Sequence, residues 1–136
     1  MSKLVLGIVM ILFITACSNE QTTAPPQDIQ PTLSSIQTNI FSTTCAVPGC
    51  HVPGGAGPMP LRNVNESFQN LVGVASVQIP ALIRVQPNDA DNSYLIRKLE
   101  GGPGIAGRRM PLGRAPLSNE EISAIRQWIN NGALNN

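Results

Sequence analysis

Aromatic and charged residues are both scarce in this sequence. Phe, Trp and Tyr account for 4% of the 136 residues, and Asp, Glu, Lys and Arg together account for 12%. A core with so few large rings often needs something else to fill it. The formal net charge is only +1, so the composition predicts no nucleic-acid partner.

Histidine is rarer still, because His51 is the only one in the chain. A second histidine is therefore missing for a catalytic dyad or for paired metal ligation, and the few carboxylates fall mostly at expected helix caps and surfaces. The sequence thus predicts that the protein is not an enzyme. Glycine and proline, by contrast, number 12 each, which favours short elements joined by long loops.

The N-terminal part of the chain is expected to direct and tether the protein. Residues 1–16 combine Lys3 with an apolar run and then small residues, which is typical of an export signal. The run is too short to span a bilayer comfortably. Residues 17–31 are polar, contain proline and lack periodicity, so we expect a flexible linker. One folded domain is then expected over residues 32–136.

Cys17 lies where the signal meets the linker. The run Ile-Thr-Ala-Cys that ends at Cys17 resembles the bacterial lipobox, and this resemblance implies that Cys17 becomes the lipidated first residue of the mature protein. Its acyl chains would hold the protein at a membrane of the bacterial cell envelope, facing the periplasm. Ser18 favours the outer membrane. The alternative is a signal peptide cut near Ala16 that leaves Cys17 free.

The apolar pattern predicts an all-α fold of about four short helices with long loops rich in Gly and Pro. Thr32 is placed to cap the first helix, whose apolar stripe continues to Phe41 and leads into the segment that follows. A short second helix is expected over residues 66–72. A third is expected over residues 92–100, with Asp91 as its N-cap.

The last helix has the clearest local signal. Ser118 and Glu121 form a capping box, and Leu117 with Ile122 forms a hydrophobic staple. The helix is amphipathic and must pack on another element, most simply on the first helix. Its apolar arc consists of Ile122, Ile125, Trp128 and Ile129.

The stretch Cys45-Ala-Val-Pro-Gly-Cys50-His51 brings two thiols and the single imidazole together. A Cys-x-x-Cys-His run is a covalent haem attachment site, in which the thiols add to the porphyrin vinyl groups and the histidine binds iron from one face. Here the spacer has four residues instead of two, and Pro48 and Gly49 let it turn tightly. The alternative is a Cys45–Cys50 disulfide beside an ordinary surface histidine, because an exported protein permits disulfides.

A haem iron with one histidine needs a second ligand from another residue type, unless one face stays open. Met59 and Met110 are the thioethers that follow the motif, and methionine–histidine ligation is typical of electron-transfer cytochromes c. Met59 lies only eight residues after His51 in a proline-bound loop, so its path to the opposite face of the ring would be very short. We therefore expect Met110 to be the ligand. Either methionine could instead fill a gap in the core.

The chain from about residue 33 to residue 134 resembles a monohaem bacterial cytochrome c domain. It is particularly similar to variant domains that are abundant in environmental and planctomycete-type proteins. The likeness depends on an N-terminal helix that runs into the Cys…Cys-His motif, and on a specific C-terminal pattern. That pattern is Arg109-Met110-Pro111, Pro116-Leu117-Ser118, Trp128-Ile129 and Gly132-Ala133.

The resemblance implies a cytochrome c-like fold with one covalent haem c, attached through Cys45 and Cys50. His51 would be the proximal iron ligand and Met110 the distal one, and the first and last helices would cross beside the haem edge. The protein would be a lipid-anchored carrier of single electrons with redox protein partners. Separately from the resemblance, five basic residues fall between positions 97 and 114: Arg97, Lys98, Arg108, Arg109 and Arg114. If Met110 faces the haem, some of them should ring its exposed edge or pair with its propionates, and a positive rim could steer an acidic redox partner. The alternative is a solvated loop with no partner.

Two other functions remain open from the sequence. One is a haem-free envelope lipoprotein closed by a Cys45–Cys50 disulfide, serving as a binding or structural module. The other is a haem sensor or peroxidase in which Met110 is not a ligand and the distal face stays open.

Overall fold

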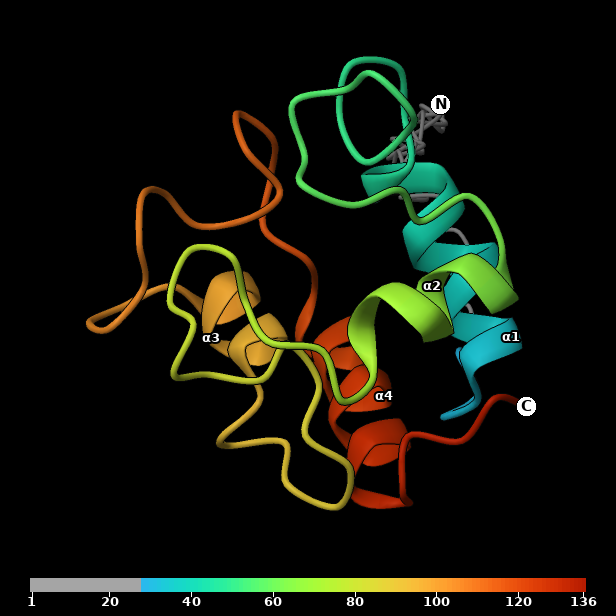
Figure 1. The fold of residues 1–136 in the computed structure, drawn as a ribbon. Helices are drawn as coiled ribbons and strands as arrows, with labels where there is room; N and C mark the ends of the chain where they lie inside the picture. Colours follow the sequence, from blue (N-terminus) through green and yellow to red (C-terminus); the bar gives the residue numbers. More distant parts are fainter. Residues whose placement is uncertain (1–27) are drawn as a thin grey trace, which may run out of the picture.

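The computed structural model describes residues 28–136 and folds them into four helical segments, with isolated bridges but no β-strand in that range (Figure 1). The predicted all-α class is confirmed. The expected signal peptide, Cys17 and most of the expected linker lie outside the described residues. Ile29, which precedes the expected domain start at residue 32, packs against the core. No helix among residues 28–136 has the length and apolar character needed to cross a membrane.

The first helical segment consists of α1 (Leu33–Ile36), which continues directly into the π-helix η1 (Gln37–Cys45). Thr32 caps it as predicted, because its side-chain oxygen accepts a hydrogen bond from the Ser35 amide. The wider winding of η1 was not predicted. Short polar side chains in this stretch donate back to carbonyls one turn earlier, a habit that competes with regular α-helix. The donors are Thr38, Asn39 and Thr43.

A buried glutamine joins the first helical segment to α2 (Val64–Leu71). The Gln37 side-chain amide donates to the Leu61 carbonyl at 2.9 Å, and its oxygen accepts from the Ser67 hydroxyl at 2.6 Å. Helix α2 begins earlier than the predicted residue 66, because Asn63 caps it by accepting from the Glu66 amide. All the polar atoms of this buried contact are paired, so it fixes the relative position of the two helices.

The predicted N-cap of α3 (Tyr94–Glu100) is wrong, because Ser93 and not Asp91 precedes its first residue. The Asp89 carboxylate accepts from the Asn92 amide at 3.1 Å, and this turn delays the start of the helix. Asp91 instead pairs with Arg126 across to the next helix, at 2.6 Å.

Helix α4 (Asn119–Asn130) begins with the predicted capping box. The Ser118 hydroxyl accepts from the Glu121 amide at 3.2 Å, and the Glu121 carboxylate accepts from the Ser118 amide at 2.7 Å. Trp128 and its apolar neighbours on this helix are buried. Helix α4 packs against both α1 and α3, so the expected contact with the first helix is confirmed.

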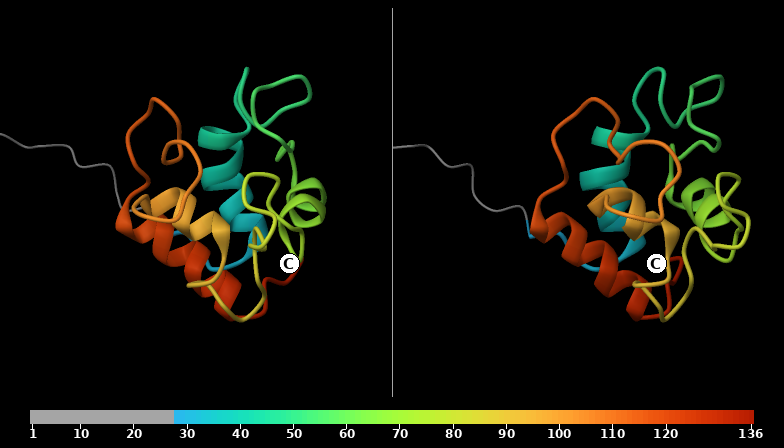
Figure 2. Two further views of the ribbon diagram at one scale, coloured as in Figure 1. Left: turned by 60° about the vertical axis from the view of Figure 1, so that its left-hand side comes forward. Right: turned by 90° about the vertical axis from the view of Figure 1, so that its left-hand side faces the viewer.

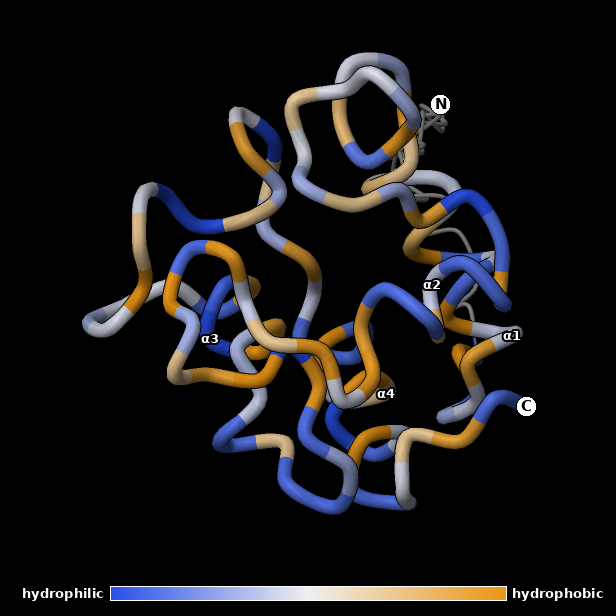
Figure 3. Tube along the Cα trace, viewed as in Figure 1, coloured by the Kyte–Doolittle hydropathy of each residue, from blue (hydrophilic) through white to orange (hydrophobic). Residues whose placement is uncertain are grey.

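The helices gather at one side of the molecule and two long loops occupy the other. Apolar positions recur along every helical segment (Figure 3), and they merge into one buried cluster that spans all four. The loop that follows η1 and the loop between α3 and α4 lie at the same end of the molecule in every view (Figures 1 and 2). The fold thus brings the cysteine motif and the Met110 segment, far apart in sequence, to one place.

Candidate cofactor site

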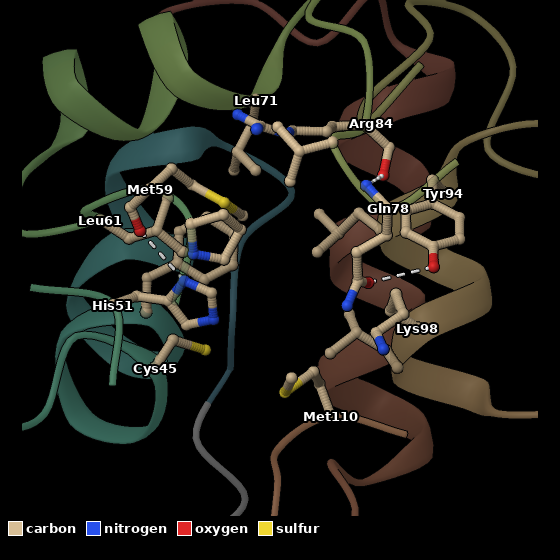
Figure 4. Close-up of a pocket in the computed structure, with 16 residues that line it drawn as sticks. Cys45, His51, Met59, Leu61, Leu71, Gln78, Arg84, Tyr94, Lys98 and Met110 are labelled. Atoms are coloured by element: carbon tan, nitrogen blue, oxygen red, sulfur yellow. Dashed lines mark hydrogen bonds between the residues drawn. The ribbon is translucent and has the colours of Figure 1, made fainter. Parts of the chain in front are cut away.

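A cavity lies between the first helical segment, α3 and the loop that carries Met110 (Figure 4). Its empty volume is about 720 Å³, a figure that includes the part open to solvent. A neighbouring hollow of about 770 Å³ shares several of its walls and extends the space to Cys50. The shared residues are Cys45, His51, Pro58, Gln78 and Met110.

The four-residue spacer folds into a closed turn. The Cys50 amide donates to the Val47 carbonyl at 3.0 Å, and the His51 amide donates to the Cys45 carbonyl at 3.1 Å. Gly49, at a φ of 80°, occupies the position of such a turn that requires a left-handed backbone. The prediction that the spacer turns tightly is confirmed. The longer spacer still brings His51 back beside Cys45.

Cys45 and Cys50 are both partly buried and both carry free thiols in the structure. Burial, followed by the neighbouring Cys50 thiol and the Glu121 carboxylate, raises the pKa of Cys45 from 9.0 to about 12, while Arg114 opposes the shift. The Cys45 thiol is therefore protonated at neutral pH. It lies at the end of η1, where the helix meets the cavity wall.

His51 is held in one orientation by the loop that follows it. Its Nδ1 lies 3.0 Å from the Met59 carbonyl oxygen. Because a carbonyl can only accept, Nδ1 must donate the hydrogen, and Nε2 then keeps its lone pair when the ring is neutral. Gly57 packs directly on the ring, and a Cβ at this position would collide with the Nδ1 and Cε1 atoms of His51. The loop therefore leaves no space for a side chain at position 57 beside the imidazole.

The two methionines reach the cavity from different parts of the chain. The carbonyl that accepts from His51 is that of Met59 itself, and Met59 and His51 lie on the same side of the cavity (Figure 4). Met110 enters from the loop between α3 and α4, and its amide donates to the Lys98 carbonyl at 2.7 Å. Met110 therefore reaches the cavity from a different part of the fold than His51 and Met59 do.

Arg84 is a cavity residue that the sequence analysis missed. It is only 8% exposed, and its Nη1 donates to the Asn70 carbonyl at 2.7 Å. Within residues 28–136, no carboxylate lies at ion-pair distance from it, and burial lowers its pKa. No Asp or Glu is found among the residues that line the cavity. A signal was present in the sequence, since Arg84 interrupts the otherwise mainly apolar stretch before Gln86.

The rim of the cavity is apolar and basic. Val77 and Leu112 are 63% and 54% exposed, and each lines part of the space. Arg108 and Arg114 are exposed on the Met110 loop. Lys98, which the sequence analysis grouped with these cations, is buried and so does not belong to the rim.

Comparison with models of protein families, with curated proteins and with solved structures gives no match. The donor set itself fits a c-type haem. The Cys45 thiol, the His51 imidazole with its Nδ1 hydrogen already donated, and the Met110 thioether line both the cavity and the neighbouring hollow, and Cys50 lines the hollow. These are the groups that haem c requires for attachment and for axial ligation.

Proposed function

We propose that this protein is a monohaem c-type cytochrome that carries single electrons in the bacterial cell envelope. The observation that carries the proposal is the His51 contact, in which Nδ1 donates to the Met59 carbonyl inside a cavity lined by Cys45. Metal-binding histidines almost always donate their other ring hydrogen in this way, which fixes the tautomer and orients the ligating nitrogen. A surface histidine beside a disulfide needs neither a cavity nor an orienting carbonyl.

Cys45 and Cys50 would hold the haem covalently. Each thiol would add across one vinyl group, with sulfur bonding one carbon and the hydrogen going to the other. The two cysteines lie on either side of the closed turn, so both can reach one edge of the ring plane.

His51 and Met110 would provide the axial ligands. The imidazole and the thioether come from separate loops, so they can approach the iron from two faces. Histidine–methionine ligation favours a relatively high reduction potential and leaves no open position for substrate chemistry. When bound, the haem supplies an iron that gains and loses one electron, and the protein supplies ligation, burial and orientation.

Arg84 supports a ligand that carries negative charge. A buried cation is costly unless it is paired, and this guanidinium has only a carbonyl partner in the described chain. Haem carries two propionates on the side of the ring opposite its vinyl groups. Arg84 lies across the cavity from Cys45 (Figure 4), so a ring attached at the cysteines would direct its carboxylates toward this side.

The remaining features of the proposal concern location and partners. A lipidated Cys17 would anchor the protein, with the outer membrane favoured, and the linker would let the haem domain reach redox proteins. Exposed Arg114 at the neighbouring hollow and exposed Arg108 on the same loop suit an acidic partner surface, whose association would slow as salt rises.

The deciding experiment is a pyridine haemochrome assay on protein produced together with a cytochrome c maturation system, with His51→Ala alongside. We expect a c-type spectrum that survives acid–acetone extraction, because thioether bonds resist it. We also expect the weak red absorption band of methionine–iron(III) ligation to disappear in Met110→Ala and to persist in Met59→Ala.

The same preparation distinguishes the other functions. A colourless protein whose Cys45 and Cys50 are oxidised to each other would exclude the cytochrome and support the disulfide-closed lipoprotein. Rapid carbon monoxide binding to the reduced wild-type protein would indicate an open distal face and support a sensor or peroxidase.

A further inference from the structure

Lys98 is a buried lysine without an acidic partner. It is 7% exposed, and within residues 28–136 no carboxylate lies at ion-pair distance from its amine. The amine instead donates to two backbone carbonyls, that of Ala106 at 2.9 Å and that of Arg108 at 2.6 Å. Lysine is seldom buried this deeply without a pairing partner. Solubility and surface charge therefore do not explain why a lysine occupies this buried position.

Both carbonyls belong to the Gly-rich loop that leads to Met110. The main chain of Lys98 makes a third contact with this loop, because its own carbonyl accepts from the Met110 amide at 2.7 Å. Lys98 thus holds the loop at residues 106, 108 and 110, on alternate residues up to the methionine. The loop contains several glycines and has no helix or strand of its own.

Tyr94 holds the same loop from one helical turn earlier. Its hydroxyl accepts from the Ala106 amide at 3.0 Å and donates to the Gln78 side-chain oxygen at 3.1 Å. Tyr94 and Lys98 are four residues apart on α3 and so lie on one face of that helix. Two side chains of α3 therefore bind Ala106: Tyr94 at its amide and Lys98 at its carbonyl. Gln78, Tyr94, Lys98 and Met110 all line the same cavity (Figure 4).

We propose that Lys98 is a positioning residue that holds the Met110 loop against α3 and thereby sets where the Met110 thioether lies over the cavity. Its ammonium supplies two strong donors to backbone groups that would otherwise lack partners. The effect of this positioning on an iron ligand rests on the proposed function. The effect on the loop itself does not.

The side chain must be charged to donate in this way with full strength. Burial lowers the pKa of Lys98 from its usual value. The groups that accept from the amine, the carbonyls of Ala106 and Arg108, are both neutral.

The test compares Lys98→Met with Arg97→Met in the full-length mature protein. Lys98→Met keeps the aliphatic stem and removes the ammonium. Arg97→Met removes the same charge from the next residue of α3, where the guanidinium contacts only Asp91 and Asn92. Hydrogen–deuterium exchange by mass spectrometry is measured in peptides covering residues 102–112, and α4 serves as an internal check of folding.

We expect Lys98→Met to speed exchange in the loop about tenfold or more while α4 keeps its protection. Arg97→Met should leave both unchanged. In haem-loaded protein, Lys98→Met should also weaken the methionine–iron band and lower the midpoint potential, and Lys98→Arg should restore part of both. If Lys98→Met also exposes α4, Tyr94→Phe replaces it, because it removes only the hydroxyl that holds Ala106.

Two results would overturn the proposal. Unchanged loop exchange in Lys98→Met would mean that Lys98 does not hold the loop. Faster loop exchange with an unchanged methionine band and midpoint potential would mean that the loop does not position the ligand. A protein that takes up no haem would instead refute the proposed function, and the exchange experiment would then decide alone whether Lys98 positions Met110.

Discussion

Replacing Gly57 by alanine should disturb His51, because this glycine lies directly against the imidazole ring. The new Cβ would collide with the Nδ1, Cγ and Cε1 atoms of the imidazole, so the ring or the loop must move. The movement would break the bond from Nδ1 to the Met59 carbonyl, now 3.0 Å long. We expect both the stability and the orientation of the ring to suffer.

The size of the effect follows from two contributions. Overpacking a closely fitted site costs about 1–3 kcal/mol, and a lost hydrogen bond costs about 1 kcal/mol. Together they predict a loss of about 2–4 kcal/mol in the free energy of unfolding. If the ring reorients, losing an outer-shell partner of this kind typically weakens metal binding about 10- to 100-fold.

The matched control is Gly54→Ala in the same loop. Gly54 has a φ of 76° and nothing within 4 Å of its Cβ position, so alanine there strains the backbone without touching His51. The cost should be about 1 kcal/mol. Denaturant unfolding of both variants gives the stabilities, and nitrogen NMR of His51 reports which ring nitrogen carries the hydrogen.

The two variants should separate stability from ligation. Gly57→Ala should change the His51 nitrogen shifts and reduce the yield of low-spin haem protein, whereas Gly54→Ala should only lower stability. If Gly57→Ala keeps the wild-type His51 shifts and the wild-type absorption spectrum, the carbonyl bond does not orient a ligand, and the main support for the proposed function is lost.

Four further predictions concern Cys45 and Arg84. In haem-free, reduced protein at neutral pH, Cys45 should alkylate much more slowly than in the unfolded chain, because burial raises its pKa to about 12 and the thiolate is the nucleophile; equal rates by mass spectrometry would contradict this. The same raised pKa stabilises the fold below about pH 9, and this contribution should be lost as the pH rises from about 9 toward 12, which unfolding curves at increasing pH will test. Glu121→Gln should keep the helix cap and lower the pKa of Cys45, because one of the groups that raises it is removed; an unchanged pH profile of alkylation would show that the carboxylate does not act on the thiol. Arg84→Gln should lower the yield of haem-loaded protein, while Arg62→Gln, which removes an exposed guanidinium paired with Glu66, should not; equal yields in the two would exclude a role for Arg84 in holding an anionic ligand.

Helix starts were predictable where short-range hydrogen bonds decide them. Thr32 and the Ser118–Glu121 capping box act within four residues, so the local sequence contains all the information needed. The start of α3 was predicted wrongly, because Asp89 forms a turn with Asn92 and the helix begins only after Ser93. Several side chains around Asp91 can cap or turn, and the choice depended on Arg126, which lies on α4 and competes for that carboxylate.

By itself, the sequence determined the all-α class, the position of the last helix, the tight turn between Cys45 and Cys50, and the short list of groups that can bind a haem. Each depends on residue type and local spacing. Only the tertiary structure decided that Met59 holds His51 through its backbone, and that Arg84 and Lys98 are buried beside the cavity. These features depend on hydrogen bonds between residues 8 to 14 positions apart in the sequence. Such contacts form only after the loops between the residues have closed and the side chains have been buried.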